Sequence, residues 1–305
     1  MKSLKTINII LLFLSVSYVG YAQKEKPTPD LVNVKYGEHE RQVLDVWFAD
    51  KHKTTPLAIF IHGGGFQSGS KEKVNRKELV KLLKAGISVA AINYRYKTIA
   101  PLPAAHNDAK LALQFIRSNA SEWNIDKKNI GVFGGSAGAQ ICMWLAFSDE
   151  MARPESDNAI EKESTRVTCV AARGGQTTME SPFWLEHIRK FSPGQEATFN
   201  GKKRLQTFGV STLEEADVIA KTISALDLIS SDDPPIFMQY GMTPNDAVPG
   251  NARRARGWVV HHVAFGTALK EKMDDLNVEA DLKYPGVKTT YNSSVAFLVA
   301  KLLSK

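Results

Sequence analysis

A serine flanked by small residues, at the junction of a strand-like and a helix-like segment, constrains this chain more than any other feature. Residues 134–138 read Gly-Gly-Ser-Ala-Gly, with the serine at position 136. An apolar stretch typical of a buried strand precedes this run, and a helical pattern follows it. Glycines two positions before and after Ser136 let strand and helix cross closely, so the serine can occupy a strained turn with its hydroxyl exposed. The pattern predicts a nucleophilic serine at the carboxyl end of a strand.

A glycine-rich loop follows another expected strand about seventy residues earlier. Residues 62–66 read His-Gly-Gly-Gly-Phe, directly after the apolar run 57–61. Acyl transfer passes through a tetrahedral oxyanion, which preorganised backbone N–H groups stabilise. We predict that the oxyanion hole consists of the Gly64 and Gly65 amides together with the Ala137 amide. The two motifs together indicate acyl-transfer chemistry.

The apolar pattern predicts one α/β domain over residues 23–305. Two alternating segments at the start are expected to form an antiparallel hairpin at a sheet edge, and the later strands alternate with helices, as in a parallel sheet. The eight expected strands cover 31–36, 43–48, 56–61, 87–94, 129–133, 166–172, 235–240 and 279–284. The expected helices include 71–84, 104–124, 137–147, 265–276 and 293–303.

A segment at about 176–233 breaks this alternation and is expected to form a helical cap over the carboxyl ends of the strands. It contains helical patches but no further strand pattern. The aromatic residues Phe183, Trp184 and Phe191 are candidates either to line a substrate pocket or to form the cap's own core.

The first 22 residues have the pattern of a signal peptide. Lys2 and Lys5 precede an apolar run at 7–19, and Gly20-Tyr21-Ala22 offers small residues for cleavage after Ala22. A single uncleaved anchor is the alternative interpretation. We expect a periplasmic or secreted protein with no membrane span after cleavage.

Charge and cysteine content exclude several function classes. The formal net charge is +7, but acids and bases are interspersed, so we expect no nucleic-acid partner. The basic cluster at 253–256, beside Trp258, indicates either a solvated loop or a contact for an anionic or sugar-linked substrate. Cys142 and Cys169 have apolar neighbours typical of buried thiols, although a disulfide stays open. No spacing of metal ligands is present, and we expect no metal or cofactor.

The chain resembles the α/β-hydrolase superfamily of esterases and lipases, within its hormone-sensitive-lipase-like and feruloyl-esterase-like (BD-FAE-like) branch. The resemblance covers residues 30–304. It implies a serine carboxylesterase that acts without a cofactor on small acyl esters, often those that decorate plant polysaccharides. The residues that carry it are the two motifs above, Asn-Tyr-Arg-Tyr at 93–96, Asp-Lys-Lys-Asn-Ile-Gly at 126–131 and Asp-Asp-Pro-Pro at 232–235.

The resemblance also implies a catalytic acid and a base, and here the chain departs from the family pattern. The acid matches Asp246 in the run 241–249, with Asn245 competing for the register. The family's histidine follows the last strand in a Tyr-Pro-Gly-x-x-His-like loop. Residues 284–291 read Tyr-Pro-Gly-Val-Lys-Thr-Thr-Tyr, and no histidine follows His262.

Two adjacent histidines, His261 and His262, are the candidates for a displaced base. They lie just before the expected helix at 265–276, where a loop could reach the rim of the site. We favour His262, because it is closer to the helix start, and keep His261 as the alternative.

The leading interpretation is a secreted hydrolase of carboxylic esters. It attacks through Ser136, with His262 as base and Asp246 orienting the imidazole, and forms an acyl-enzyme on a small-molecule or carbohydrate-linked ester. The alternative is a catalytically silent α/β-hydrolase that acts as a binding or accessory protein. A peptidase of the same fold is a third option.

Overall fold

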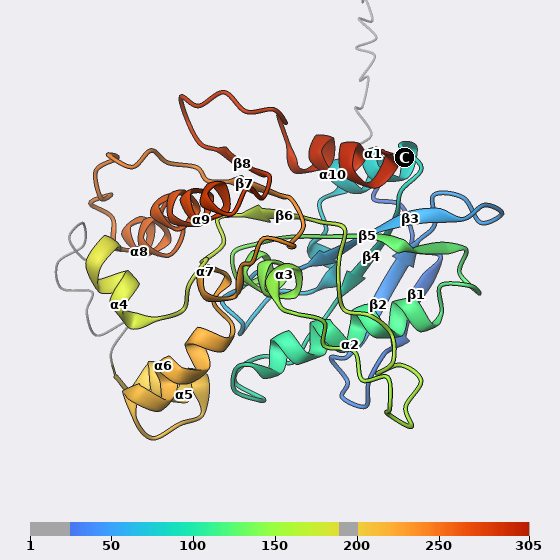
Figure 1. Cartoon of the computed structure of the whole chain (residues 1–305), viewed down its shortest axis with the longest axis horizontal. Helices are drawn as coiled ribbons and strands as arrows, with labels where there is room; N and C mark the ends of the chain where they lie inside the picture. The colour runs from blue at the N-terminus through green and yellow to red at the C-terminus, as the bar shows by residue number, and fades with distance from the viewer. Residues whose placement is uncertain (1–24, 189–200, 305) are drawn as a thin grey trace, which may run out of the picture.

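The computed structural model describes residues 25–188 and 201–304. One eight-stranded sheet runs through it, in the order β1-β2-β4-β3-β5-β6-β7-β8 (Figure 1). The β1–β2 and β2–β4 pairs are antiparallel, and every later pair is parallel. The predicted α/β architecture with an edge hairpin is therefore confirmed. The strands are β1 (Leu31–Lys35), β2 (Val43–Trp47), β3 (Thr55–Ile61), β4 (Ser88–Ile92), β5 (Ile125–Gly135), β6 (Cys169–Arg173), β7 (Ile236–Gln239) and β8 (Ala280–Lys283).

Helices cover both faces of the sheet, and strand alternation decides which side chains meet them. On β3, Leu57, Ile59 and Ile61 belong to one buried cluster, while Ala58 and Phe60 belong to the other. This period of two is why a strand with nearly continuous apolar sequence can bury both faces. The first cluster lies under α2 (Ala104–Ser118), α3 (Ala137–Phe147) and α9 (Ala264–Asp275), and the second under α1 (Arg76–Lys84) and α10 (Ser294–Leu303).

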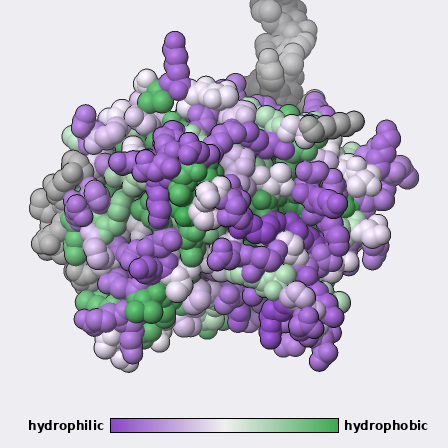
Figure 2. Space-filling model, viewed as in Figure 1, coloured by the Kyte–Doolittle hydropathy of each residue, from purple (hydrophilic) through white to green (hydrophobic). Residues whose placement is uncertain are grey.

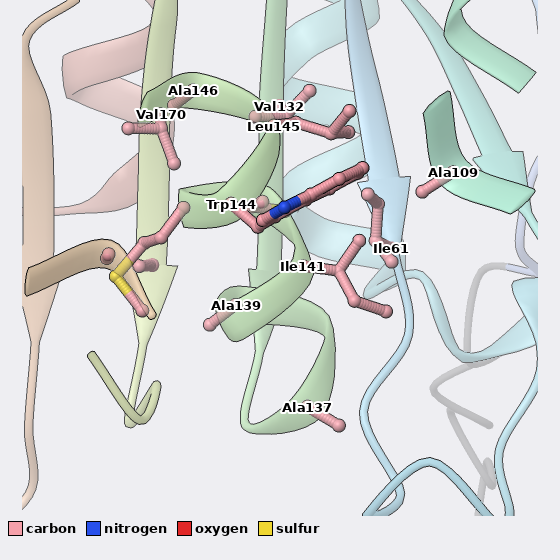
Figure 3. Close-up of a cluster of buried hydrophobic side chains, with 14 of the residues drawn as sticks. Ile61, Ala109, Val132, Ala137, Ala139, Ile141, Trp144, Leu145, Ala146 and Val170 are labelled. Carbon is pink, nitrogen blue, oxygen red and sulfur yellow. The ribbon is translucent and has the colours of Figure 1, made fainter. Parts of the chain in front are cut away.

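Helix α3, which follows Ser136, is buried along its whole length. Its side chains point toward Ile61 of β3 and toward Val170 of β6 (Figure 3). Trp144 also donates a hydrogen bond from Nε1 to the Thr222 carbonyl, at 3.2 Å. A helix that is apolar on every side is held by the core all round, so its N-terminus, where Ser136 lies, has a fixed position.

The segment between β6 and β7, which we call the cap segment (176–233), contains short helices and no strand among its described residues. They are α4 (Ser181–Phe183), the π-helix η2 (Trp184–Ile188), α5 (Lys202–Phe208), α6 (Leu213–Thr222) and α7 (Ala225–Leu228). The rings of Phe183 and Trp184 pack against Phe265 of α9, with centroids 5.4 and 4.7 Å apart. Phe191 lies outside the described residues.

Local sequence explains where the elements differ from expectation. The expected helix at 71–84 divides into a 3₁₀ turn η1 (Lys71–Lys73) and α1, because the Asn75 side chain accepts from the Lys77 and Glu78 amides and caps a new helix. Asn251 caps α8 (Ala252–Val260) in the same way, and the sequence had not predicted this helix.

The surface seen in Figure 2 is mainly hydrophilic, with hydrophobic residues in separate patches. Cys142 and Cys169 are both buried and free. Among the helices that the structure describes, none has the length and apolarity needed to cross a membrane. The expected signal peptide at 1–22 falls outside the described residues and stays a prediction.

Candidate active site

Ser136 occupies the turn between β5 and α3 in a conformation that side chains rarely adopt, with φ 54° and ψ −123°. Its amide donates to the Arg173 carbonyl of β6 at 2.8 Å, which fixes the turn. A Cβ atom on Gly134 would lie 2.5 Å from the Ile61 carbonyl oxygen, and one on Gly138 only 2.1 Å from it. Any larger residue at either position would therefore push the turn off the end of β3, which is why this turn requires both glycines.

His261 is the residue that the structure brings to the serine. Its Nε2 atom lies 2.9 Å from Ser136 Oγ. It is the C-cap of α8, so the helix end aims the imidazole at the carboxyl ends of the strands. Gly174, at φ +54°, lies beside this ring, and a Cβ there would be 3.3 Å from His261 Cδ2. A nucleophile and a base within hydrogen-bond reach form the core of a serine hydrolase site.

The surroundings of His261 favour the neutral imidazole. Burial lowers its pKa from the usual value, and a hydrogen bond to the Gly257 carbonyl opposes that shift in part. Because Nε2 faces the serine, Nδ1 is the ring nitrogen on the side of the Gly257 carbonyl, which also accepts from the His261 backbone amide at 3.1 Å. A proton on Nδ1 leaves Nε2 free to accept the serine proton.

His262, which the sequence favoured as the base, does not face Ser136. Its side chain is buried, with its ring centroid 4.4 Å from that of Trp258, and its Nδ1 accepts from the Ala264 amide at 3.1 Å. It therefore caps the start of α9. The two adjacent residues leave the end of α8 in different directions, so the assignment of the base to His262 is corrected in favour of His261.

Asp246, the expected acid, is not brought to His261. Its carboxylate is exposed and accepts from Thr243, from the amide at 3.2 Å and from Oγ1 at 2.5 Å. These two hydrogen bonds lower the pKa of the Asp246 carboxyl. Within the described chain, a backbone carbonyl orients His261 where a triad would use a carboxylate, so the arrangement is a Ser136–His261 dyad.

Of the predicted oxyanion residues, Gly65 lines a cavity together with Ser136, Gly64 precedes it in the loop, and Ala137 follows Ser136 in the chain. Gly64 has φ +118° and Gly65 φ +60°, and a Cβ on Gly64 would lie 2.0 Å from the Ser68 carbonyl oxygen. In the part of the chain that the structure describes, neither amide donates to a protein acceptor. Ala137 is the first residue of α3, so helix geometry leaves its amide without an intrahelical partner. Three backbone donors are thus available beside Ser136.

Contacts among His62, Tyr94 and Arg41 hold the oxyanion loop (62–66) in place, and of these three residues the sequence had not singled out Arg41. His62 is fully buried, stacks on Tyr94 at 4.2 Å between centroids, and has its Nδ1 2.8 Å from the Gly63 carbonyl. Arg41 donates to the Tyr94 carbonyl at 2.8 Å and to the Gly69 carbonyl at 3.3 Å. Burial lowers the pKa of His62 to about 4, so this ring is neutral and structural at pH 7.

Ser136 lines two cavities. The first, which we call the cap cavity, has a volume of about 270 Å³ and lies between Gly65 and Phe66 of the oxyanion loop and residues of α5 and η2. The second measures about 480 Å³ and is lined by residues that include Arg173, Met242 and His261. An ester placed across Ser136 could put its acyl and alcohol parts in different cavities.

Comparison with known proteins shows the family to which the chain belongs. The sequence model of BD-FAE matches residues 44–252. The chain belongs to the BD-FAE family. It is 28% identical over 239 residues to the probable carboxylic ester hydrolase LipM of Mycobacterium tuberculosis, covering 74% of this chain and 50% of LipM. It is 32% identical over 110 residues to Esterase LipC of the same organism, covering 35% of this chain and 27% of LipC. The chain thus spans half or less of the length of these two relatives.

Solved structures confirm the α/β-hydrolase fold of this BD-FAE member. A truncated carbohydrate esterase from gut microbiota superposes with a TM-score of 0.64 at 23% identity, covering 86% of this chain and 89% of that one. An acetyl ester-xyloside bifunctional hydrolase from Caldicellulosiruptor lactoaceticus gives a TM-score of 0.58 at 22% identity, covering 79% and 77%. At these identities the likeness concerns the fold.

Proposed function

We propose that this protein is a serine hydrolase of carboxylic esters that works through an acyl-enzyme, with Ser136 as nucleophile and His261 as base. The observation that carries the proposal is the 2.9 Å contact between His261 Nε2 and Ser136 Oγ, at a strained turn beside three available amides. The relatives named as esterases support it.

In the first step, Ser136 Oγ attacks the carbonyl carbon of the ester while His261 Nε2 takes the hydroxyl proton. The carbonyl oxygen becomes an oxyanion, which the Gly64, Gly65 and Ala137 amides stabilise. The C–O bond to the alcohol then breaks, and the imidazolium returns its proton to the departing alkoxide. The products are the free alcohol and an ester between the acyl group and Ser136.

In the second step, water attacks the acyl group of the Ser136 ester, and His261 again accepts and then returns one proton. The acid leaves and Ser136 regains its hydroxyl. The lowered pKa of His261 keeps the imidazole neutral at pH 7, as both steps require. The Gly257 carbonyl stabilises the transient imidazolium less than a full negative charge would, so we expect slower turnover than in a complete triad.

For the substrate, we propose small acyl esters linked to carbohydrate. The carbohydrate esterase and the acetyl ester-xyloside hydrolase among the structural neighbours support this class. We also propose export from the cytoplasm, which rests on the signal-like pattern at 1–22.

One observation favours a second candidate function. Because Asp246 does not face His261, the silent α/β-hydrolase acting as a binding protein remains a physical alternative. Incubation of the purified protein with 4-nitrophenyl acetate and with acetylated xylo-oligosaccharides separates the two. The esterase proposal expects release of acetate from both substrates by the wild type, and none above background by Ser136→Ala. Equal rates for the two proteins would favour the binding protein.

A further inference from the structure

The cap cavity has an unusual charge content for a site beside a catalytic serine. Lys97, Lys203 and Arg204 all line it. None of its described lining residues is an aspartate or a glutamate. The cavity therefore presents cationic side chains to whatever group of a substrate enters it.

The positive charge of Arg204 is paired with a carboxylate within the fold. Its guanidinium forms an ion pair with Asp217 of α6 and donates to the Met179 carbonyl at 3.0 Å. It also lies 5.0 Å from the centre of the Phe208 ring. We assign Arg204 to the packing of the cap segment, which leaves the two lysines.

Lys97 is held at the cavity wall, and none of the carboxylates in residues 25–188 and 201–304 forms an ion pair with it. Its amide donates to the Phe66 carbonyl at 2.7 Å, so its backbone is attached to the end of the oxyanion loop. Its ammonium group donates to the neutral hydroxyl of Thr207 at 3.1 Å. Among the described residues, no carboxylate forms an ion pair with Lys97 or with Lys203. Burial and the charge of Lys203 both lower the pKa of Lys97.

We propose that the cap cavity recognises ester substrates that also carry a carboxylate group, with Lys97 and Lys203 as its binding residues. The inference rests on the proposed esterase function and deepens it by naming the substrate class. A carboxylate between the two ammonium groups would relieve their mutual repulsion and form charge-assisted hydrogen bonds with the half-buried Lys97 and the exposed Lys203. The three exposed arginines of α8 add positive potential near the site and would steer an anionic substrate toward it.

The carboxylate could belong to either part of the ester, and matched substrates distinguish the two. For the alcohol part, we compare a monoacetylated methyl glucopyranosiduronate with the equivalent monoacetylated methyl glucopyranoside. For the acyl part, we compare monomethyl adipate with dimethyl adipate. In each pair kcat/KM is measured by pH-stat titration. The readout, called the anionic-to-neutral ratio, is kcat/KM for the anionic substrate divided by kcat/KM for the neutral one. We expect this ratio to be roughly tenfold or more for one of the pairs and to fall as NaCl rises from about 0.02 M to about 0.5 M.

Variants test whether the two lysines cause the preference. Lys97→Met and Lys203→Met each keep the length and apolar stem of the side chain but remove the charge. Each should lower the anionic-to-neutral ratio about fivefold or more, and the double variant should bring it close to one. The control is Lys53→Met, an exposed lysine before β3 at the opposite end of the parallel strands. It removes the same net charge and should leave the ratio unchanged.

A wild-type ratio near one for both pairs would overturn the inference, and so would a ratio that persists in the Lys97→Met, Lys203→Met double variant. If no ester is hydrolysed at all, the proposed function fails, and binding then decides the inference separately. Calorimetric titration of Ser136→Ala should show tighter binding of the anionic member of one pair, weakened by Lys97→Met. Equal binding of both members of each pair would contradict it.

Discussion

The Nε2 atom of His261 lies 2.9 Å from the Oγ atom of Ser136, although the two residues are 125 positions apart in the chain. The contact joins the end of α8 to the turn before α3. The backbone carbonyl of Gly257, within α8 itself, orients the same imidazole. One helix end therefore positions the proposed base, and its identity can be tested against its neighbour in sequence.

Replacing the two adjacent histidines should have very different effects. His261→Ala removes the base and should lower kcat by about 10²–10⁴. His262→Asn keeps a side-chain acceptor for the Ala264 amide and should retain kcat within about fivefold, with a loss of roughly 1 kcal/mol in unfolding free energy. Ester hydrolysis and urea unfolding of the two variants measure both effects. A larger activity loss in His262→Asn than in His261→Ala would restore His262 as the base.

Asp246→Asn should have little effect on turnover. The Asp246 carboxylate is exposed and bonds Thr243, whereas removing the oriented carboxylate of a working triad lowers kcat by about 10⁴. We expect kcat for an aryl acetate to stay within about fivefold of the wild type. A fall of a hundredfold or more would mean that Asp246 moves onto His261 during catalysis.

The two oxyanion glycines should differ in their tolerance of a side chain. A Cβ on Gly64 would lie 2.0 Å from the Ser68 carbonyl oxygen, whereas a Cβ on Gly65 meets nothing within 4 Å. Gly64→Ala should therefore displace the loop and lower kcat by about 10²–10³, the cost of losing an oxyanion donor. Gly65→Ala suffers only from its positive φ, a cost of roughly 1–2 kcal/mol in stability. Steady-state kinetics of both variants should show a larger loss of kcat for Gly64→Ala than for Gly65→Ala. A larger loss for Gly65→Ala would argue against this loop geometry.

Stability should fall between pH 7 and pH 5 because of His106. This residue is fully buried in α2 beside Phe66 and Trp144, and burial lowers its pKa to about 4 despite the hydrogen-bond contact with Gln140. The unfolded chain, with a histidine pKa near 6.5, binds the proton first as the pH falls. The contribution of neutral His106 to the free energy of unfolding is thus complete above pH 6.5 and is lost as the pH falls toward 4. At pH 5 this contribution has fallen by about 2 kcal/mol.

The matched variant for this prediction is His106→Leu, which cannot titrate. It should be less stable than the wild type at pH 7, but its unfolding free energy should drop about 2 kcal/mol less on going from pH 7 to pH 5. Urea titrations of the wild type and of His106→Leu at pH 7 and pH 5 give the four unfolding free energies that the comparison needs. The same pH dependence in both proteins would show that His106 is not buried in its neutral form.

The sheet and the nucleophile could be predicted from sequence because their signals are local. Apolar runs locate the strands within a few residues, and the glycines around Ser136 are required by contacts with Ile61, which any strand–turn–helix of this kind makes. Helix α8 was missed because its three arginines were taken to indicate a solvated loop, although Ala255, Trp258 and Val259 have the spacing of one buried helix face.

The base and the residues that hold the oxyanion loop could not be predicted from sequence. A shift of one residue along the chain decides between His261 and His262, and the loop is held by contacts between residues that are far apart in the sequence. Successive residues at a helix end point about 100° apart, so His261 and His262 cannot be told apart without the position of α8. Arg41 reaches His62 of the oxyanion loop from the β1–β2 hairpin, with Nη2 3.4 Å from the imidazole Nε2, and no local pattern marks this contact. Asp246 was assigned from the family register alone, which says nothing about where its carboxylate points.

The most direct test of the Ser136–His261 dyad is labelling with a fluorophosphonate probe, followed by intact-mass analysis and peptide mapping. The account predicts one adduct per wild-type molecule, on Ser136. It predicts none on Ser136→Ala, and labelling about a hundredfold or more slower for His261→Ala, because the serine then lacks its base. Wild-type protein that stays unlabelled, or that labels at the same rate when His261 is replaced by alanine, would contradict it.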